Sequence, residues 1–116
     1  LVKDNHVVAA GGVAQAFAAV REQFPGLPVE VEVDSLDQLD EVVAAGADLV
    51  LLDNFSPAEM AEAVARVSGQ VVLEASGGLT LADAGAVAAT GVDFVAVGAL
   101  THSAAVLDIG ADLQSI

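Results

Sequence analysis

Three charged side chains of the sequence stand at or near the ends of short strand-like runs. Glu32 lies in the alternating run VEVEV, Asp53 follows LVLL, and Lys3 follows the opening Leu-Val pair. Two carboxylates with no cysteine in the sequence and no pair of histidines beside them suit Mg²⁺ or Mn²⁺, whose remaining ligands are usually water and substrate oxygens. Glu32 and Asp53 are therefore the predicted metal ligands.

Each carboxylate also has an ordinary structural explanation. In VEVEVD the alternation separates a valine face from an acidic face that carries Glu30, Glu32 and Asp34. On an isolated strand the acidic face would simply be solvated. Inside a barrel the valines would pack on helices and the glutamates would point into the lumen, where a carboxylate is costly unless it is paired or bound to a metal. Asp53 could equally be a turn residue or a helix-capping partner.

Two glycine-containing loops follow later strands. ASGG (75–78) precedes the expected helix start at Thr80, so its amides and the helix dipole could hold a phosphate. VGAL (97–100) repeats the pattern one strand later, and barrels often bind phosphate in the loops after their last two strands. His102 is either structural or a donor to a phosphate or pyrophosphate, and His6 has a weaker claim. The predicted substrate-binding residues of these loops are Ser76, Gly77, Gly78, Val97, Gly98, Ala99 and His102.

The elements that must position these residues alternate along the chain. Strands are predicted at 29–33, 49–52, 71–74 and 94–97, with a strand stub at 1–3. Three helices are predicted to start at Ser35, Ser56 and Thr80, with complete capping boxes at the first two and an approximate one at Thr80. They are predicted to end near Gly46, Gly69 and Gly91, and an earlier helix has apolar residues at Val13, Phe17, Val20 and Phe24.

A strand followed by a helix, repeated along the chain, predicts an α/β fold with parallel strands. An open doubly wound sheet would concentrate its chemistry at one switch point, whereas here every strand exit carries polar or glycine residues. The sequence therefore predicts a partial, TIM-barrel-like (β/α) barrel of about five βα units. Since a full barrel needs about 250 residues, we expect the C-terminal part of one.

Composition narrows the function. A net charge of −14, with only three Lys and Arg residues among 116, argues against nucleic-acid binding. The chain is 55% hydrophobic, enough for one domain core, but no stretch approaches the roughly 20 apolar residues of a membrane span. With no cysteine there are no disulfides, and a cytoplasmic location is the default expectation.

Taken in order, KDNH, EVEVDSLDQLDE, LLDNF, LEASGGL, GVDFVAVGALTHSA and LDIGADL closely resemble the C-terminal barrel of quinolinate phosphoribosyltransferase, also called nicotinate-nucleotide pyrophosphorylase (carboxylating). The resemblance covers essentially all of residues 1–116. It implies the C-terminal portion of a type II phosphoribosyltransferase barrel, without the family's N-terminal sandwich domain and first barrel strands.

The resemblance also implies an activity. The family transfers a phosphoribosyl group from 5-phosphoribosyl 1-pyrophosphate to quinolinate, giving nicotinate mononucleotide, pyrophosphate and CO₂ for NAD synthesis, and it works as a homodimer or larger oligomer. Lys3 would contact anionic substrates, and Glu32 and Asp53 would hold the ribose hydroxyls and Mg²⁺, so the resemblance makes these three the predicted catalytic residues. The glycine loops would hold the 5-phosphate.

Two alternatives stay open. One is the molybdenum-transport protein of the same superfamily. The other is an inert barrel fragment that acts only as an association module. Arg21 and Arg66 are expected on solvent-facing helices, so few cations remain for quinolinate, and we expect the isolated chain to be inactive.

Overall fold

The computed structural model describes residues 1–104, 107 and 110–113. Within them, four parallel strands form one sheet in the order β1-β2-β3-β4. The strands are β1 (Glu30–Val33), β2 (Leu49–Asp53), β3 (Val72–Ser76) and β4 (Phe94–Val95). Val2 adds a parallel bridge to Val31, which confirms the predicted strand stub at the start of the chain.

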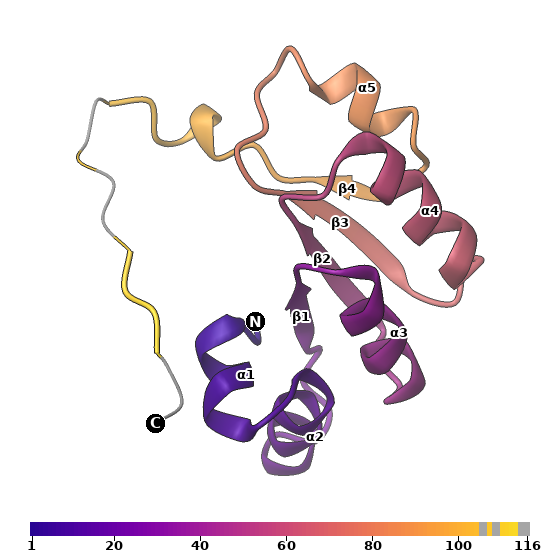
Figure 1. The fold of residues 1–116 in the computed structure, drawn as a ribbon, viewed down its shortest axis with the longest axis vertical. Coiled ribbons are helices and arrows are strands. Elements are labelled where there is room, and N and C mark those ends of the chain that lie inside the picture. Colours follow the sequence, from indigo (N-terminus) through magenta and orange to yellow (C-terminus); the bar gives the residue numbers. More distant parts are fainter. Residues whose placement is uncertain (105–106, 108–109, 114–116) are drawn as a thin grey trace.

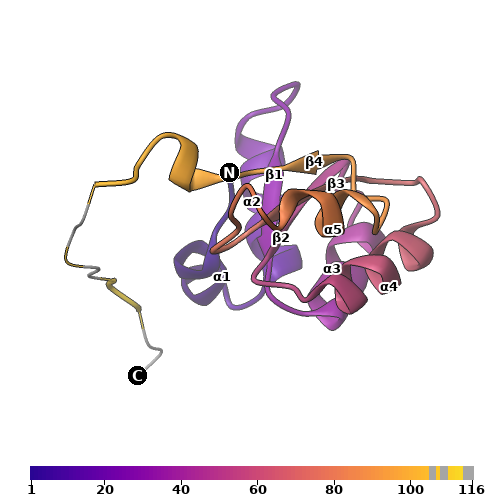
Figure 2. The same cartoon turned by 90° about the horizontal axis from the view of Figure 1, so that it is seen from above.

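Helices flank this sheet. α1 (Asp4–Ala10) and α2 (Val13–Gln23) precede β1, while α3 (Leu36–Ala44), α4 (Pro57–Val67) and α5 (Ala84–Ala88) follow β1, β2 and β3, and a short 3₁₀ helix, η1 (Gly98–Leu100), follows β4. Figure 1 shows α3, α4 and α5 side by side along the sheet, with α1 and α2 next to β1. Figure 2 shows α3 and α4 on the same side of the sheet.

Strand alternation separates a core face from an open face. Val31 and Val33 are fully buried, together with Val50, Leu52, Leu73 and Ala75, in the core formed with the helices. On the open face, the register places Glu30 beside Leu49, Glu32 beside Leu51, and Glu74 beside Phe94. Phe94 is 58% exposed on that face. The predicted split between valines and glutamates is confirmed, and the sheet is an open parallel α/β structure that fits a partial barrel.

Local hydrogen bonds explain why α4 begins where the sequence predicts. Ser56 donates its backbone N–H to Glu59 Oε2 (2.8 Å), and Glu59 N–H donates to Ser56 Oγ (3.3 Å), with Pro57 in the first turn. The side-chain bond from Ser56, followed by the backbone bond, lowers the pKa of the Glu59 carboxyl. The predicted helix ends are also confirmed, since Gly46, Gly69 and Gly91 all have left-handed φ angles.

Two other helix starts differ in detail from the prediction. Ser35 is the N-cap of α3, as predicted, but its side chain makes no capping hydrogen bond, and Gln38 Oε1 accepts from the N–H of Asp34 rather than from that of Ser35. Thr80 N–H does donate to Asp83 Oδ2 (2.9 Å), but the following residues form turns and α5 starts only at Ala84.

The helix α1 was not predicted at all. Its sequence has no hydroxyl cap, and the stabilising contact is unusual: the N–H of Lys3 donates to His6 Nδ1 at 3.0 Å. His6 is therefore a capping residue in this structure.

Among the described residues no helix is both long and apolar enough to cross a bilayer.

Candidate functional site

A pocket of about 380 Å³ lies at the carboxyl ends of the strands. The stub, β1 and β2 contribute Lys3, Glu32 and Asp53, while the segments after β3 and β4 contribute the two glycine loops. It is lined by Lys3, Glu32, Asp53, Ser76, Gly77, Gly78, Leu79, Thr80, Ala96, Gly98, Ala99 and His102. Parallel strands bring their carboxyl ends to the same edge, and for this reason residues far apart in the sequence meet here.

Lys3 and Glu32 form an ion pair across the stub and β1. Lys3 Nζ lies 3.5 Å from Glu32 Oε2, and the side chains are 53% and 16% exposed respectively. The backbone holds both in register, since Val2 N–H donates to Glu30 O (2.8 Å) and Glu32 N–H donates to Val2 O (2.9 Å). Lys3 thus places a cation beside the more buried carboxylate, and its exposed ammonium can also meet an anion in the pocket.

Asp53 ends β2 on the same face as Glu32. Its Oδ2 accepts a hydrogen bond from Asn54 Nδ2 at 2.9 Å. Glu32 and Asp53 are not adjacent in register, because Glu32 pairs with Leu51 and Asp53 pairs with Ser76. They nevertheless line the same two pockets, and both carboxylates can contact one ligand.

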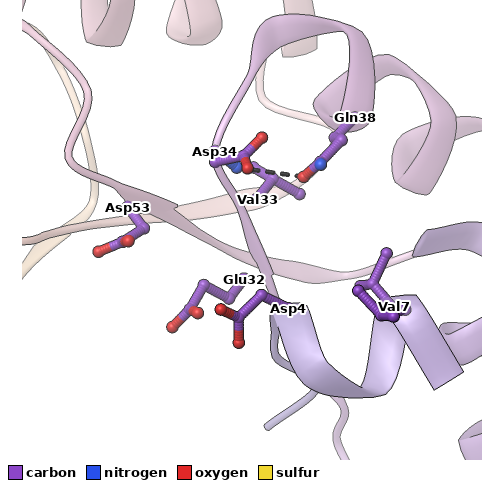
Figure 3. A pocket seen from close by; sticks show the side chains of 8 residues that line it. Asp4, Val7, Glu32, Val33, Asp34, Gln38 and Asp53 are labelled. Atoms are coloured by element: carbon purple, nitrogen blue, oxygen red, sulfur yellow. Dashed lines mark hydrogen bonds between the residues drawn. The ribbon is translucent and has the colours of Figure 1, made fainter. Parts of the chain in front are cut away.

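The second of these pockets, of about 200 Å³, adjoins the first on the side of α1 and α3. Figure 3 shows the carboxylates of Asp4, Glu32 and Asp53 directed toward the same open side, while Asp34 and Gln38 are bonded to each other beyond them. Asp4 was missed as a site residue, although its place directly after the Lys3 strand end was a signal. Its carboxylate makes this edge of the pocket more acidic.

The glycine loop after β3 is bent tightly. Gly77 and Gly78 have φ angles of +93° and +59°, which favour glycine. The predicted helix start at Thr80 was wrong: turns follow this loop and α5 begins only at Ala84, so no helix N-terminus comes directly after the glycines. What remains is a loop whose backbone borders the pocket and whose Ser76 hydroxyl comes from the strand end.

The loop after β4 forms η1. His102 N–H donates to Gly98 O (2.9 Å), and this bond holds the histidine next to the loop at the pocket wall. Val97 is not among the residues that line the pocket, and Ala96, one residue earlier, lies there instead. The sequence analysis did not predict three further lining residues, Leu79, Thr80 and Ala96. Their only signal was their position in or next to the glycine loops.

A metal ion would find only part of its ligands here. Among the described residues no group of three or more His, Asp or Glu side chains is arranged to hold one. Glu32 and Asp53 are hard oxygen donors that share a pocket, which fits Mg²⁺ bound mainly by water and substrate oxygens. Their role as metal ligands therefore stays a prediction.

Known proteins match this chain in sequence along nearly its whole length. Residues 1–112 match the quinolinate phosphoribosyl transferase C-terminal domain family. The nicotinate-nucleotide pyrophosphorylase [carboxylating] of Mycobacterium leprae is 55% identical over 97% of this chain and 41% of its own length. The human protein of the same name is 44% identical, with 97% of this chain and 39% of its own length aligned.

Solved structures agree. The nicotinate-nucleotide pyrophosphorylase from Francisella tularensis superposes with a TM-score of 0.82 at 45% identity, covering 86% of this chain and 36% of that protein. The one from Ehrlichia chaffeensis gives 0.84 at 34% identity, over 88% and 37%. The chain spans about two fifths of the length of the curated relatives it matches. On this match of sequence and fold, the chain belongs to the quinolinate phosphoribosyl transferase family and corresponds to its C-terminal domain.

Proposed function

We propose that this chain carries the phosphoribosyl-pyrophosphate half of a quinolinate phosphoribosyltransferase site, in a pentosyltransferase that makes nicotinate mononucleotide. The observation that supports this most strongly is the single pocket lined by Lys3, Glu32, Asp53 and both glycine loops. The names of the relatives support the reaction, which releases pyrophosphate and CO₂.

The ligand 5-phosphoribosyl 1-pyrophosphate has three chemically distinct parts, and the pocket has a partner for each. The 5-phosphate would accept hydrogen bonds from the backbone and from Ser76 in the glycine loops, with His102 beside them. The ribose hydroxyls would donate to Glu32 and Asp53. Lys3 would face the anionic substrates at the pocket edge.

Bond breaking at the ribose C1 releases pyrophosphate and leaves positive charge on the sugar ring. Carboxylates held near that ring stabilise the charge as it develops, which is a major electrostatic contribution to catalysis. The pyridine nitrogen of quinolinate then bonds to C1, and the ring carbon that loses CO₂ takes up a proton. Lys3, 3.5 Å from Glu32, limits the repulsion between Glu32 and the other carboxylates until the sugar arrives.

Mg²⁺, when bound, would neutralise the pyrophosphate leaving group. Glu32 and Asp53 are the residues that would hold it, together with Asp4 if the ion sits toward the smaller pocket. Mn²⁺ would bind to the same oxygen donors.

Quinolinate recognition is not assigned to this chain. Both arginines lie on the outer helices: Arg21 pairs with Asp48 (3.3 Å) and Arg66 with Asp40 (2.7 Å) and Glu62 (2.6 Å). We propose that other cations complete the dicarboxylate site in the whole enzyme, which works as a homo-oligomer. The names of the relatives favour this reaction over molybdenum transport.

Calorimetry of the 116-residue chain tests the half-site. Phosphoribosyl pyrophosphate titrated with Mg²⁺ present should give saturable binding, and Glu32→Gln or Asp53→Asn should weaken it by about tenfold or more. Glu22→Gln, an exposed carboxylate on α2, is the matched control and should bind as the parent does.

Binding that is absent in the parent chain, or equal in all four proteins, would reject the half-site and favour an inert association module. Self-association seen by light scattering, in samples that bind no sugar phosphate, would identify that module. Binding of molybdate in place of the sugar phosphate would instead support the transport-type relative.

A further inference from the structure

Asn54 lies between Asp53 and the glycine loop after β3, and it does not itself line the proposed site. It follows Asp53 at the end of β2 and has a φ of +58°. Among the described residues Ser68 is the only other non-glycine residue with positive φ. Such a conformation is unfavourable for most residues and is tolerated best by asparagine and aspartate, so the surrounding contacts must hold it.

Two hydrogen bonds use this conformation. The backbone N–H of Asn54 donates to Ser76 O at 3.0 Å, which continues the β2–β3 pairing one step beyond the last paired residues. The side-chain Nδ2 donates to Asp53 Oδ2 at 2.9 Å. One residue thus contacts the carboxylate on one strand and the start of the glycine loop on the next.

Close packing adds a third contact. A Cβ atom built on Gly77 would lie 2.6 Å from the backbone nitrogen of Asn54 and would also overlap its side-chain amide. Only glycine fits there, and Gly77 itself has a φ of +93°. The loop that borders the pocket therefore rests directly on Asn54, and the separation between Asp53 and Gly77 is set by this contact.

We propose that Asn54 is a positioning residue: its amide orients the Asp53 carboxylate, and its left-handed backbone sets the distance from Asp53 to the Gly77–Gly78 loop. The inference rests on the proposed function, because it assigns the ligand as a sugar phosphate that touches both. With Oδ2 of Asp53 bound to Asn54, Oδ1 is the carboxylate oxygen that would meet the ligand.

The chain offers a matched pair of substitutions. Asn54→Gly keeps the left-handed backbone accessible and removes only the amide. Ser68→Gly makes the same kind of change at the end of α4, where the hydroxyl donates to Ala65 O and does not border the pocket. If Asn54 served only to form the turn, glycine would replace it without loss.

Calorimetry with phosphoribosyl pyrophosphate and Mg²⁺ should show about tenfold or weaker binding for Asn54→Gly, with an unchanged urea midpoint, whereas Ser68→Gly binds as the parent does. Asn54→Asp, which keeps the shape but places a second carboxylate beside Asp53, should bind more weakly still. Parent-like affinity of Asn54→Gly, or a loss of affinity matched by a loss of stability, would overturn the proposal.

A ligand-free measurement separates this inference from the proposed function. In NMR spectra of the free chain, Asn54→Gly should average the Asp53 side-chain rotamers and broaden or shift the Gly77 and Gly78 amide signals, while Ser68→Gly leaves them unchanged. If the parent chain fails to bind the sugar phosphate but these changes appear, the positioning role stands and only the ligand is wrong. Unchanged Asp53 and Gly77 signals in Asn54→Gly would overturn the positioning role.

Discussion

The two ends of the sheet are built from the same β/α unit but use their polar residues differently. At the amino ends, a pocket of about 200 Å³ includes Asp48, Leu73 and Asp93. There Asp93 Oδ2 accepts the N–H of Leu73 (2.8 Å), and Asp48 O accepts that of Val72 (3.0 Å).

At the carboxyl ends the carboxylates instead bond to other side chains that line or border the pocket. Glu32 contacts Lys3, and Asp53 contacts Asn54. At the amino ends the carboxylate of Asp93 and the backbone carbonyl of Asp48 therefore complete the sheet's hydrogen bonding, whereas Glu32 and Asp53 at the carboxyl ends line a space that a ligand can fill. We expect replacement of the Asp93 carboxylate at the amino end to change stability, and replacement of Glu32 or Asp53 at the carboxyl ends to change binding.

The largest expected effect is at Gly77, in the loop at the carboxyl ends. Gly77→Ala imposes a left-handed alanine and pushes a methyl group to 2.6 Å from Asn54 N, so we expect a loss of about 2–3 kcal/mol in unfolding free energy, along with weaker ligand binding. Gly69→Ala is the control: its φ of +75° gives the strain, but nothing lies within 4 Å of the new Cβ, and about 1 kcal/mol should be lost. Equal losses in urea unfolding would show that the contact with Asn54 has no effect.

Asp93 gives the next largest effect, at the opposite end. Asp93→Ala leaves the N–H of Leu73, a residue that is 1% exposed, without its acceptor, and should cost about 1–2 kcal/mol. Asp93→Asn keeps an acceptor oxygen and should cost less. Affinity for phosphoribosyl pyrophosphate should be unchanged in both. A variant that folds stably but loses affinity would contradict the division between the two ends.

The smallest expected effect concerns Glu30, two residues before Glu32 on the same face. Its Oε1 is buried with no hydrogen-bond partner among the described residues. Burial, followed by repulsion from Glu74, raises the pKa of Glu30, with the amino group of Leu1 opposing the shift. The nearby Lys3 is paired with Glu32 rather than with Glu30.

Because the folded chain holds this proton more tightly than the unfolded chain, the contribution of Glu30 is most favourable below its ordinary pKa of about 4.5 and is lost as pH rises through the raised value. Glu30→Gln should therefore stabilise the chain at pH 7, by less than about 1 kcal/mol, and flatten the pH dependence of the urea midpoint. A lower midpoint for Glu30→Gln at pH 7 would show that the charged carboxylate has a partner.

Much of the fold was predictable because its signals are local. Alternation in VEVEV identified the buried and open faces of β1, and Ser56 with Glu59 identified the start of α4. The same signals failed where a competing contact intervened. Gln38 bonds to Asp34 rather than to Ser35, and the first turns after Thr80 stop short of an α-helix.

By itself, the sequence determined the parallel α/β order, the family and the residue types at each strand end, since periodicity and motif spacing are properties of the chain alone. Only the tertiary structure decided that Lys3 pairs with Glu32, that His6 caps α1, and that Asn54 takes a left-handed turn against Gly77. These contacts depend on which strands lie side by side and in what register, and no local sequence pattern encodes that arrangement.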